Sequence, residues 1–274
     1  MTQYIRRVRV SVGQPGQRGR AIEGLRVTFR VERDLGREPN RADLSIYNPA
    51  PETIRAFQEP GAVCRLEAGY GDALGVLFLG RVDRAVSTSR GVDVVLQVEA
   101  QDGGTRLRGA EITESFSPGT DLRSVYAALA RALGLPLGAQ AEIPRVSIRR
   151  GLVLSGPVAD ALDLVSRSVG LVWSVQDDEI QIIAGDAESA TLASDTGESA
   201  PLLSASSGLI GSPSQTDTGV ELEVLLDPRI RPGRRFVLQS EALSGVYRCE
   251  SLEHIGDSWD GQQYYTRIEA RVAE

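Results

Sequence analysis

Lysine is absent from this sequence of 274 residues, so every basic side chain apart from the single histidine is an arginine. Arginine suits bidentate pairs with carboxylates at protein interfaces, and a GC-rich genome is the other explanation that we weigh. The net charge of −7 is unevenly placed, because residues 1–37 carry nine arginines against three acids. The acidic remainder argues against tight nucleic-acid binding. We interpret the basic N-terminal part as a solvated strand face, with contact to an acidic partner as the alternative.

Cysteine and long apolar runs are also scarce. Cys64 and Cys249 each lie in an alternating apolar run, which predicts small buried thiols and leaves a bridge between them open. No run approaches the roughly 18 apolar residues of a membrane helix, and the N-terminus lacks the apolar core of a signal peptide. We therefore expect a chain without stable membrane association that is made in the cytosol and is either kept there or assembled there into something larger.

The side chains that most often carry chemistry are few. His254 is the one histidine, and Asp257 follows it by three residues. A catalytic triad would also need a serine nucleophile, and the G-x-S-x-G motif that would supply it is missing from the sequence. One histidine and two separated cysteines lack the ligand spacing of a zinc site, and 5% aromatic content is low for a base- or sugar-stacking platform. We expect no catalytic, metal or cofactor site, and we interpret His254 as a strand-end residue bonded to a turn.

Alternation of apolar and polar residues predicts short strands through the first hundred residues, most clearly at 25–34 and 92–100. Pro51 begins a predicted helix of one or two turns. Gly80, inside an apolar run, suggests a bulge or bend. Several short strands separated by turns favour a closed barrel or a sandwich.

Helical periodicity replaces this alternation after residue 111. Two amphipathic helices and a hairpin over Asp177 and Asp178 predict a small α/β unit that ends near residue 187. The predicted end signals are Thr120 and Gly134 for the first helix, and Pro157 and Gly170 for the second.

The last part of the chain is again β in pattern, after a linker rich in small polar residues at 188–207. The stretch GLIGSPSQTDTG at 208–219 has the glycines of a phosphate loop. However, it lacks the lysine and the following helix, and an alternating strand comes next. We interpret it as the lead-in to a strand.

Five stretches carry a resemblance to a known family: PNRADLSIYNPAPETIRAF, CRLEAGYGDALGVLFLGRV, VEAQDGG, GLIGSPSQTDTGVELEVLLDPRIRPG and YRCESLEHIGDSWDGQQYYTRIEA. In this order they resemble the central baseplate hub proteins of tailed phages, which are related in fold to the base of type VI secretion spikes. We interpret the residues that carry the resemblance as turn and strand-end positions that set the fold. They are Asn40, Tyr47, Asn48, Gly69, Gly71, Gly211, Pro213, Pro228, Gly233, His254, Gly256 and Asp257.

The resemblance implies a mainly β chain in which two tube-type β-barrel domains flank a small α/β domain. The expected parts are an N-terminal barrel at 1–110, the α/β domain at 111–187, the linker at 188–207 and a second barrel at 208–274. Strands from the middle region could complete the second barrel.

The resemblance also implies a structural role in the virion, without catalysis or cofactor. Such hubs form homotrimeric rings of pseudo-six-fold symmetry that continue a hexameric tail tube and hold a three-fold spike, here a separate protein. DNA only passes through the lumen. The tape-measure and baseplate wedge proteins are further expected partners, and we expect a contractile tail.

Within such a ring we expect an arginine-rich face to meet an acidic face of another subunit or of a partner. The residues chosen for this contact are Arg26, Arg30 and Arg33 on one side and Glu221 and Glu223 on the other. Two rival hypotheses remain. A tail-associated cell-wall hydrolase would need paired carboxylates or a histidine-based nucleophile at a spacing not found here. A receptor-binding tail-tip module is disfavoured by the low aromatic content.

Overall fold

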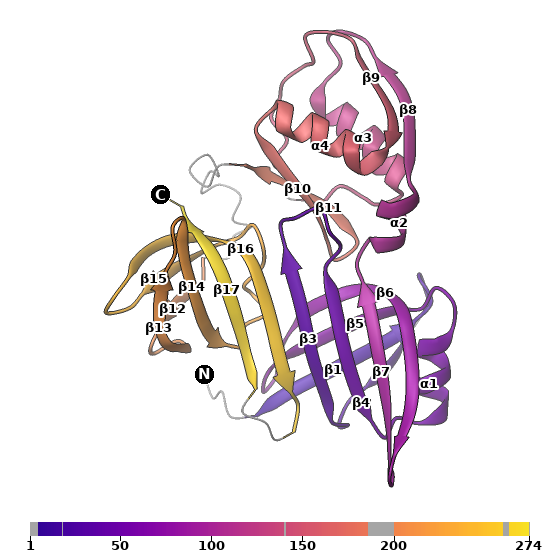
Figure 1. Cartoon of the computed structure of the whole chain (residues 1–274), viewed down its shortest axis with the longest axis vertical. Helices are drawn as coiled ribbons and strands as arrows, with labels where there is room; N and C mark the ends of the chain where they lie inside the picture. Colours follow the sequence, from indigo (N-terminus) through magenta and orange to yellow (C-terminus); the bar gives the residue numbers. More distant parts are fainter. Residues whose placement is uncertain (1–4, 18, 140, 186–199, 260–262, 274) are drawn as a thin grey trace. The chain divides into compact units, whose positions relative to one another are not determined.

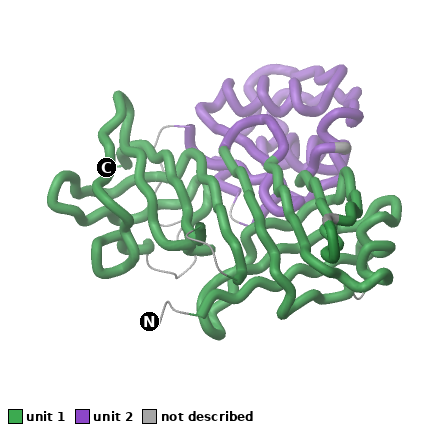
Figure 2. The backbone as a smooth tube through the Cα atoms, turned by 60° about the horizontal axis from the view of Figure 1, so that its bottom comes forward, with its two compact units in different colours: residues 1–34, 40–102, 200–274 green, residues 35–39, 103–199 purple. Residues whose placement is uncertain are grey.

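The computed structural model describes residues 5–17, 19–139, 141–185, 200–259 and 263–273. Most of these residues lie in strands, with four helices among them (Figure 1). Two compact units make up the chain, and Figure 2 colours them separately. Unit 1 gathers residues 1–34, 40–102 and 200–274, whereas unit 2 is formed by 35–39 and 103–199.

Unit 1 contains one sheet of 13 strands to which both ends of the chain contribute. Its strands run in the order β13-β14-β17-β16-β3-β4-β7-β6-β5-β1-β2, with β12 and β15 attached beside β16. The antiparallel pair of β3 and β16 joins the two β regions of the sequence. The strand bounds are β1 Arg6–Gly13, β2 Arg20–Ile22, β3 Val27–Asp34, β4 Arg41–Tyr47, β5 Val63–Tyr70, β6 Ala73–Arg90, β7 Asp93–Gln101, β12 Leu202–Ser204, β13 Leu209–Gln215, β14 Gly219–Leu225, β15 Arg235–Gln239, β16 Ser244–Asp257 and β17 Tyr264–Val272.

The predicted alternation governs how these strands are buried. In β3, for example, Val27, Phe29 and Val31 are buried while Arg30 and Glu32 are exposed. The helix α1 (Pro51–Gln58) begins at Pro51 as predicted and buries Phe57. Because burial of each large apolar side chain contributes about 1.5–3 kcal/mol, this inward set holds the sheet to its core.

Two separate hydrophobic cores lie against this single sheet. One is built mainly from β1–β7 and α1, and the other from β12 and β14–β17. The predicted abundance of strand is confirmed. The described strands pair along an open path from β13 to β2, so the two closed barrels stay a prediction. The domain boundaries expected from the sequence also stay a prediction.

Unit 2 has its own core, and it contains the two predicted helices and the predicted hairpin. Asp177 and Asp178 take φ values of 54° and 64° at the hairpin turn. A short helix and a two-stranded sheet, β8 with β9, are present in addition to the predicted elements. The element bounds are α2 Gly104–Gly109, β8 Glu111–Phe116, α3 Leu122–Leu133, β9 Leu152–Pro157, α4 Val158–Ser168, β10 Leu171–Gln176 and β11 Glu179–Ala184.

The predicted helix ends are correct to within a residue or so. Gly134 is the left-handed C-cap of α3, with φ at 72°. The N-cap is Asp121 rather than Thr120, whose hydroxyl instead donates to the carbonyl of Ser117 at 2.7 Å. Pro157 is the N-cap of α4 rather than a residue of its first turn.

Three other expectations need correction. Within the predicted linker, Leu202–Ser204 forms β12, which pairs in parallel with β15, while residues 186–199 lie outside the described part. Gly80 is not at either register shift of β6, so the expected bulge is wrong there, while the alternative of a bend stays a prediction. A Cβ at Gly80 would lie 2.5 Å from the Gln101 carbonyl oxygen, so this close approach requires the glycine. Cys64 and Cys249 are both free and buried, which removes the possibility of a bridge. The stretch interpreted as the lead-in to a strand is itself a strand, β13, and the expected strand follows it as β14.

Candidate functional site

Unit 1 presents a broad charged face, formed by the outward side chains of β14, β17, β16, β3, β4, β7 and β6. Strand register aligns these side chains in rows, because residues directly opposite each other on neighbouring strands point to the same side. Carboxylates outnumber arginines on this face. Its acids include Glu32, Asp34, Asp43, Glu99, Glu221, Glu223, Glu253 and Glu269, and its arginines include Arg30, Arg41, Arg81, Arg84, Arg267 and Arg271.

A chain of ion pairs crosses the centre of the charged face. Arg267 on β17 lies between Glu223, at 2.6 Å, and Glu253, at 3.5 Å. Arg30 on β3 also contacts Glu253, and it pairs with Glu32 at 2.9 Å. Each exposed pair contributes only about 0.2–1 kcal/mol, but together they fix the rotamers of long side chains over four strands.

Asp43 lies where the acids of the charged face crowd together. Burial is the main cause that raises its pKa, and the charges of Glu99 and Glu32 raise it further. Crowded carboxylates repel one another, so this part of the face disfavours contact with another anion.

Arg26, which was expected at an interface, meets Tyr47 and Asp257, which carried the resemblance, at the N-terminal end of β3. The Arg26 guanidinium pairs with the Asp257 carboxylate at 2.8 Å and lies over the ring of Tyr47, 4.8 Å from its centroid. This cluster ties the start of β3 to the end of β16 and to β4. Arg26 is therefore engaged within its own chain.

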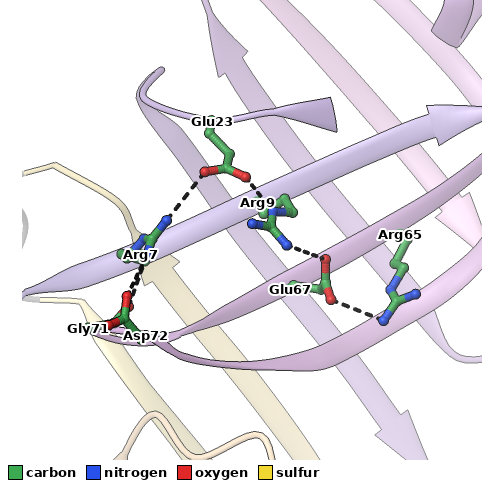
Figure 3. Close-up of polar contacts among 7 residues, drawn as sticks. All are labelled: Arg7, Arg9, Glu23, Arg65, Glu67, Gly71 and Asp72. Carbon is green, nitrogen blue, oxygen red and sulfur yellow. Dashed lines mark hydrogen bonds and ion pairs between the residues drawn. The ribbon is translucent and has the colours of Figure 1, made fainter. Parts of the chain in front are cut away.

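The basic N-terminal strands are neutralised by nearby acids (Figure 3). Glu23 bridges Arg7, at 3.4 Å, and Arg9, while Glu67 accepts from Arg65 at 3.0 Å and lies 3.9 Å from Arg9. The hydrogen bond from Arg9 is the main cause that lowers the pKa of Glu23. These pairs fit the solvated strand face that we favoured.

Arg33 and Asn40 are buried, and both have structural partners. Arg33 donates to the Leu77 carbonyl at 2.9 Å. The Asn40 amide and side chain both donate to the Asp102 carboxylate, at 2.9 and 2.8 Å. Asn40 in turn accepts from the Asp34 amide at 3.0 Å. Burial removes Arg33 from the surface of the free chain.

The remaining residues that carried the resemblance occupy turns, bulges and close approaches. Asn48 has φ at 53° and exchanges hydrogen bonds with Asp93 and Val94. Left-handed φ values also occur at Gly71, Gly211 and Gly233. Gly69 and Gly256 lie inside strands where a Cβ would meet the Ala73 carbonyl and the Phe29 ring, and Pro228 packs on Gly75. Pro213 is buried at the irregularity of β13.

His254 lies inside β16, three residues before its last residue, and its side chain contacts a neighbouring strand rather than a turn. Its Nδ1 lies 2.8 Å from the Thr266 hydroxyl across the β16–β17 pair. Burial, together with the positive charges of Arg33 and Arg231, lowers its pKa to about 3. A neutral, fully buried imidazole of this kind is suited to packing rather than to proton transfer near neutral pH.

No group of three or more metal-ligating side chains occurs in the part of the chain that the structure describes. Likewise, none of its described helices is long and apolar enough to cross a membrane.

A family described as baseplate hub gp41 matches residues 25–269. The chain belongs to this family. Baseplate hubs are structural proteins of the phage tail, so this protein is located in the virion. None of the curated protein sequences is similar enough to count as a relative of this hub.

Solved structures share the fold of the hub. The 43 kDa tail protein of prophage MuSo2 from Shewanella oneidensis is 12% identical, with 96% of each chain covered and a TM-score of 0.65. The tail protein of Neisseria meningitidis MC58 is 13% identical over 98% of the hub and 97% of that chain, with a TM-score of 0.67. The E. coli c3393 protein, a type VI secretion component described as similar to T4 tail proteins gp27 and gp5, is 11% identical. The similarity covers 96% of the hub and 77% of that chain, with a TM-score of 0.60.

Sequence reasoning missed three residues that organise the hub. Tyr264, in a run marked only as a strand, joins β17 to β1 and β5 through its hydroxyl. Glu253 and Arg267 connect the charged face. Their alternation with buried neighbours places them on the outward side, but pairing with Arg30 and Glu223 depends on a strand register that the sequence does not display.

Proposed function

We propose that the hub assembles as a homotrimeric ring with pseudo-six-fold symmetry. In this proposal one side of the ring continues the hexameric tail tube and the other holds a separate three-fold spike. A tape-measure protein and the wedge proteins of a contractile baseplate are further partners. Assembly takes place in the host cytoplasm, and the finished ring lies in the virion.

The observation that carries this proposal is the pair of hydrophobic cores on one sheet. Each chain supplies two β cores, one from β1–β7 and one from β12 and β14–β17. Three copies would therefore supply six β bodies, which matches a six-fold tube on one side and a three-fold partner on the other. The tail proteins and the type VI secretion component that share this fold support the same role.

The part of the charged face on β4, β6 and β7, around Asp43 and Glu99, supports a lumen through which DNA passes. Its crowded carboxylates would repel the phosphate backbone rather than bind it. The crowding around Asp43 strengthens this effect, because it leaves acid that the neighbouring arginines do not fully compensate. DNA contact would then be transient.

The proposal is tested by negative-stain electron microscopy and sedimentation of the purified protein at high concentration. We expect three-fold rings with a central hole about as wide as a DNA duplex, sedimenting at three times the chain mass. Protein that remains monomeric both alone and when mixed with its tail tube and spike would contradict the trimeric hub.

A further inference from the structure

Four arginines form a basic patch on unit 2, which we call the arginine patch: Arg123, Arg145, Arg149 and Arg150. All four side chains are exposed. Backbone hydrogen bonds hold their segments together, because the Leu122 amide donates to Val146 and the Ile148 amide donates to Thr120, both at 2.9 Å. An isolated β-bridge between Asp121 and Ser147 fixes the same alignment.

The arginine patch forms no ion pair among the described residues, although the carboxylate of the N-cap residue Asp121 lies on the same segments. Arginines elsewhere in the described residues form ion pairs, for example Arg30 and Arg267 on unit 1, but these four form none there. Arg123 also lies in the first turn of α3, which contains no acidic residue. A helix N-terminus favours a carboxylate, so an arginine there costs the free chain helix stability. Val146, 47% exposed between the arginines, adds an apolar side chain to the patch.

A complementary surface lies on unit 1, in a row that crosses β13, β14, β17, β16 and β3. We call its three carboxylates, Asp34, Glu221 and Glu269, the acidic row. Glu221 and Glu269 are exposed and directly opposite each other, which is a repulsive cross-strand arrangement. Serine hydroxyls occupy the other places of the row, and Ser251 donates to Glu269 at 2.9 Å.

Of the two arginines beside this row on β17, one is already engaged by other carboxylates. Arg267 and Arg271 flank Glu269 along β17, and Arg267 is held by Glu223 and Glu253. Within the described residues neither Glu221 nor Glu269 forms an ion pair. Glu221 and Glu269 thus face each other without an ion pair in the described part of the chain, and the arginines of the patch have none there either.

We propose that the arginine patch of one copy of the hub binds the acidic row of a neighbouring copy. This contact rests on the proposed ring, in which every subunit must use two different surfaces. It replaces the pairing of Arg26, Arg30 and Arg33 with Glu221 and Glu223, since Arg26, Arg30 and Glu223 are paired within the chain and Arg33 is buried. Only Glu221 is retained.

Nucleic acid fits the patch less well than protein does. A polyanion would be repelled by the net charge of −7. Val146 would gain nothing from a phosphate backbone, whereas it would be buried in a protein interface, where an apolar centre surrounded by charged groups is usual.

Charge reversal tests the contact by sedimentation velocity of the full chain. We expect Arg149→Glu/Arg150→Glu, and separately Glu221→Arg/Glu269→Arg, to weaken self-association at least about 10-fold. Combining all four substitutions in one chain should restore trimers. Mixing the two double variants should give hetero-complexes, because each then offers the charge that the other lacks. Raising NaCl from about 0.05 M to about 0.5 M should weaken the wild-type trimer.

Two controls separate loss of contact from loss of folding. Arg20→Glu/Arg131→Glu changes the net charge equally at exposed arginines outside the patch, and it should leave self-association unchanged. Arg123→Glu should raise the melting temperature, because it places a carboxylate at the start of α3, yet weaken self-association. A merely structural role cannot produce these opposite effects.

If both double variants still form the same rings as the wild type, the proposed contact is wrong and the trimeric hub remains supported. Failure of the fourfold variant and of the mixture to associate would overturn the contact too. Binding of a short DNA duplex that is lost in Arg149→Glu/Arg150→Glu, with self-association unchanged, would assign the patch to nucleic acid instead. Wild-type protein that never forms trimers would contradict the hub proposal itself.

Discussion

The hydroxyl of Tyr264, in the first residue of β17, lies 3.1 Å from the amide nitrogen and 3.0 Å from the carbonyl oxygen of Gly69 on β5. It also reaches the Arg7 carbonyl at 2.9 Å. Because β5 and β17 are distant in the strand order, this side chain joins parts of the sheet that backbone pairing leaves apart. Burial raises the pKa of Tyr264, so the hydroxyl keeps its proton over the ordinary pH range.

Tyr264→Phe removes this link without changing the ring. We expect a loss of about 1–3 kcal/mol in the free energy of unfolding, because the buried Gly69 amide loses its partner. Chemical denaturation measures this loss. Tyr265→Phe, on the outward side of β17, is the matched control and should cost no more than about 0.5 kcal/mol. Equal effects at the two tyrosines would contradict the role of the Tyr264 hydroxyl.

Gly256→Ala tests the close approach of β16 to β3. The new Cβ would lie 2.2 Å from the Phe29 ring, so the core must shift, at a cost of about 1–3 kcal/mol. Thermal unfolding should show the decrease. At Gly245, on the same strand, the nearest atom would be 3.4 Å away, and Gly245→Ala should be nearly neutral. A neutral Gly256→Ala would show that this packing is looser than described.

His254 should make the hub sensitive to acid. Its folded-state pKa of about 3 lies below the ordinary 6.5, so the unfolded chain binds the proton more readily. Stability is therefore complete above pH 6.5 and falls as the pH decreases toward 3. Between pH 6.5 and 4.5 this linkage amounts to about 2–3 kcal/mol. Denaturation across this range should show a steeper loss for the wild type than for His254→Gln, and identical slopes would contradict the depressed pKa.

The two cysteines should be unreactive in the folded hub. Burial raises the pKa of Cys64 to about 12 and raises that of Cys249 as well, so neither forms the thiolate that alkylating reagents attack. We expect no labelling by iodoacetamide under native conditions and two labels per chain in denaturant, measured by mass spectrometry. Labelling of the folded protein, or fewer than two labels after unfolding, would contradict two free buried thiols.

Local patterns in the sequence predicted local structure well. Alternation located β3, β4 and β7, and Gly134 marked the end of α3, because each signal depends on neighbours along the chain. Strands β8 and β9 were not predicted, since neither has a regular apolar face: β8 buries Ile112 alone, and β9 buries Leu154 alone. Their pairing is decided by contacts within unit 2, which local periodicity does not encode.

The candidate surfaces were harder to predict for the same reason. Charge counting identified the arginines of β3, but it could not show that Arg33 turns inward while Arg30 turns outward to Glu253. The inward turn of Arg33 follows from the two-residue alternation of β3, which puts it on the side of the buried Val31. The contact of Arg30 with Glu253 depends on the register of β3 against β16, two strands from opposite ends of the chain. The resemblance to a family did supply what periodicity could not, namely the structural role in a phage tail.

The pairing of β3 with β16 also sets the order of events on the ribosome. Asp257, which holds Arg26, is synthesised 231 residues later, or roughly 10–50 seconds at about 5–20 residues per second. During that interval β3 has one open edge, whereas the residues of unit 2 follow each other almost continuously and can fold while synthesis proceeds. The sheet is completed last, by the C-terminal strands. A chain truncated before β16 would therefore expose an unpaired strand edge, and such edges promote aggregation.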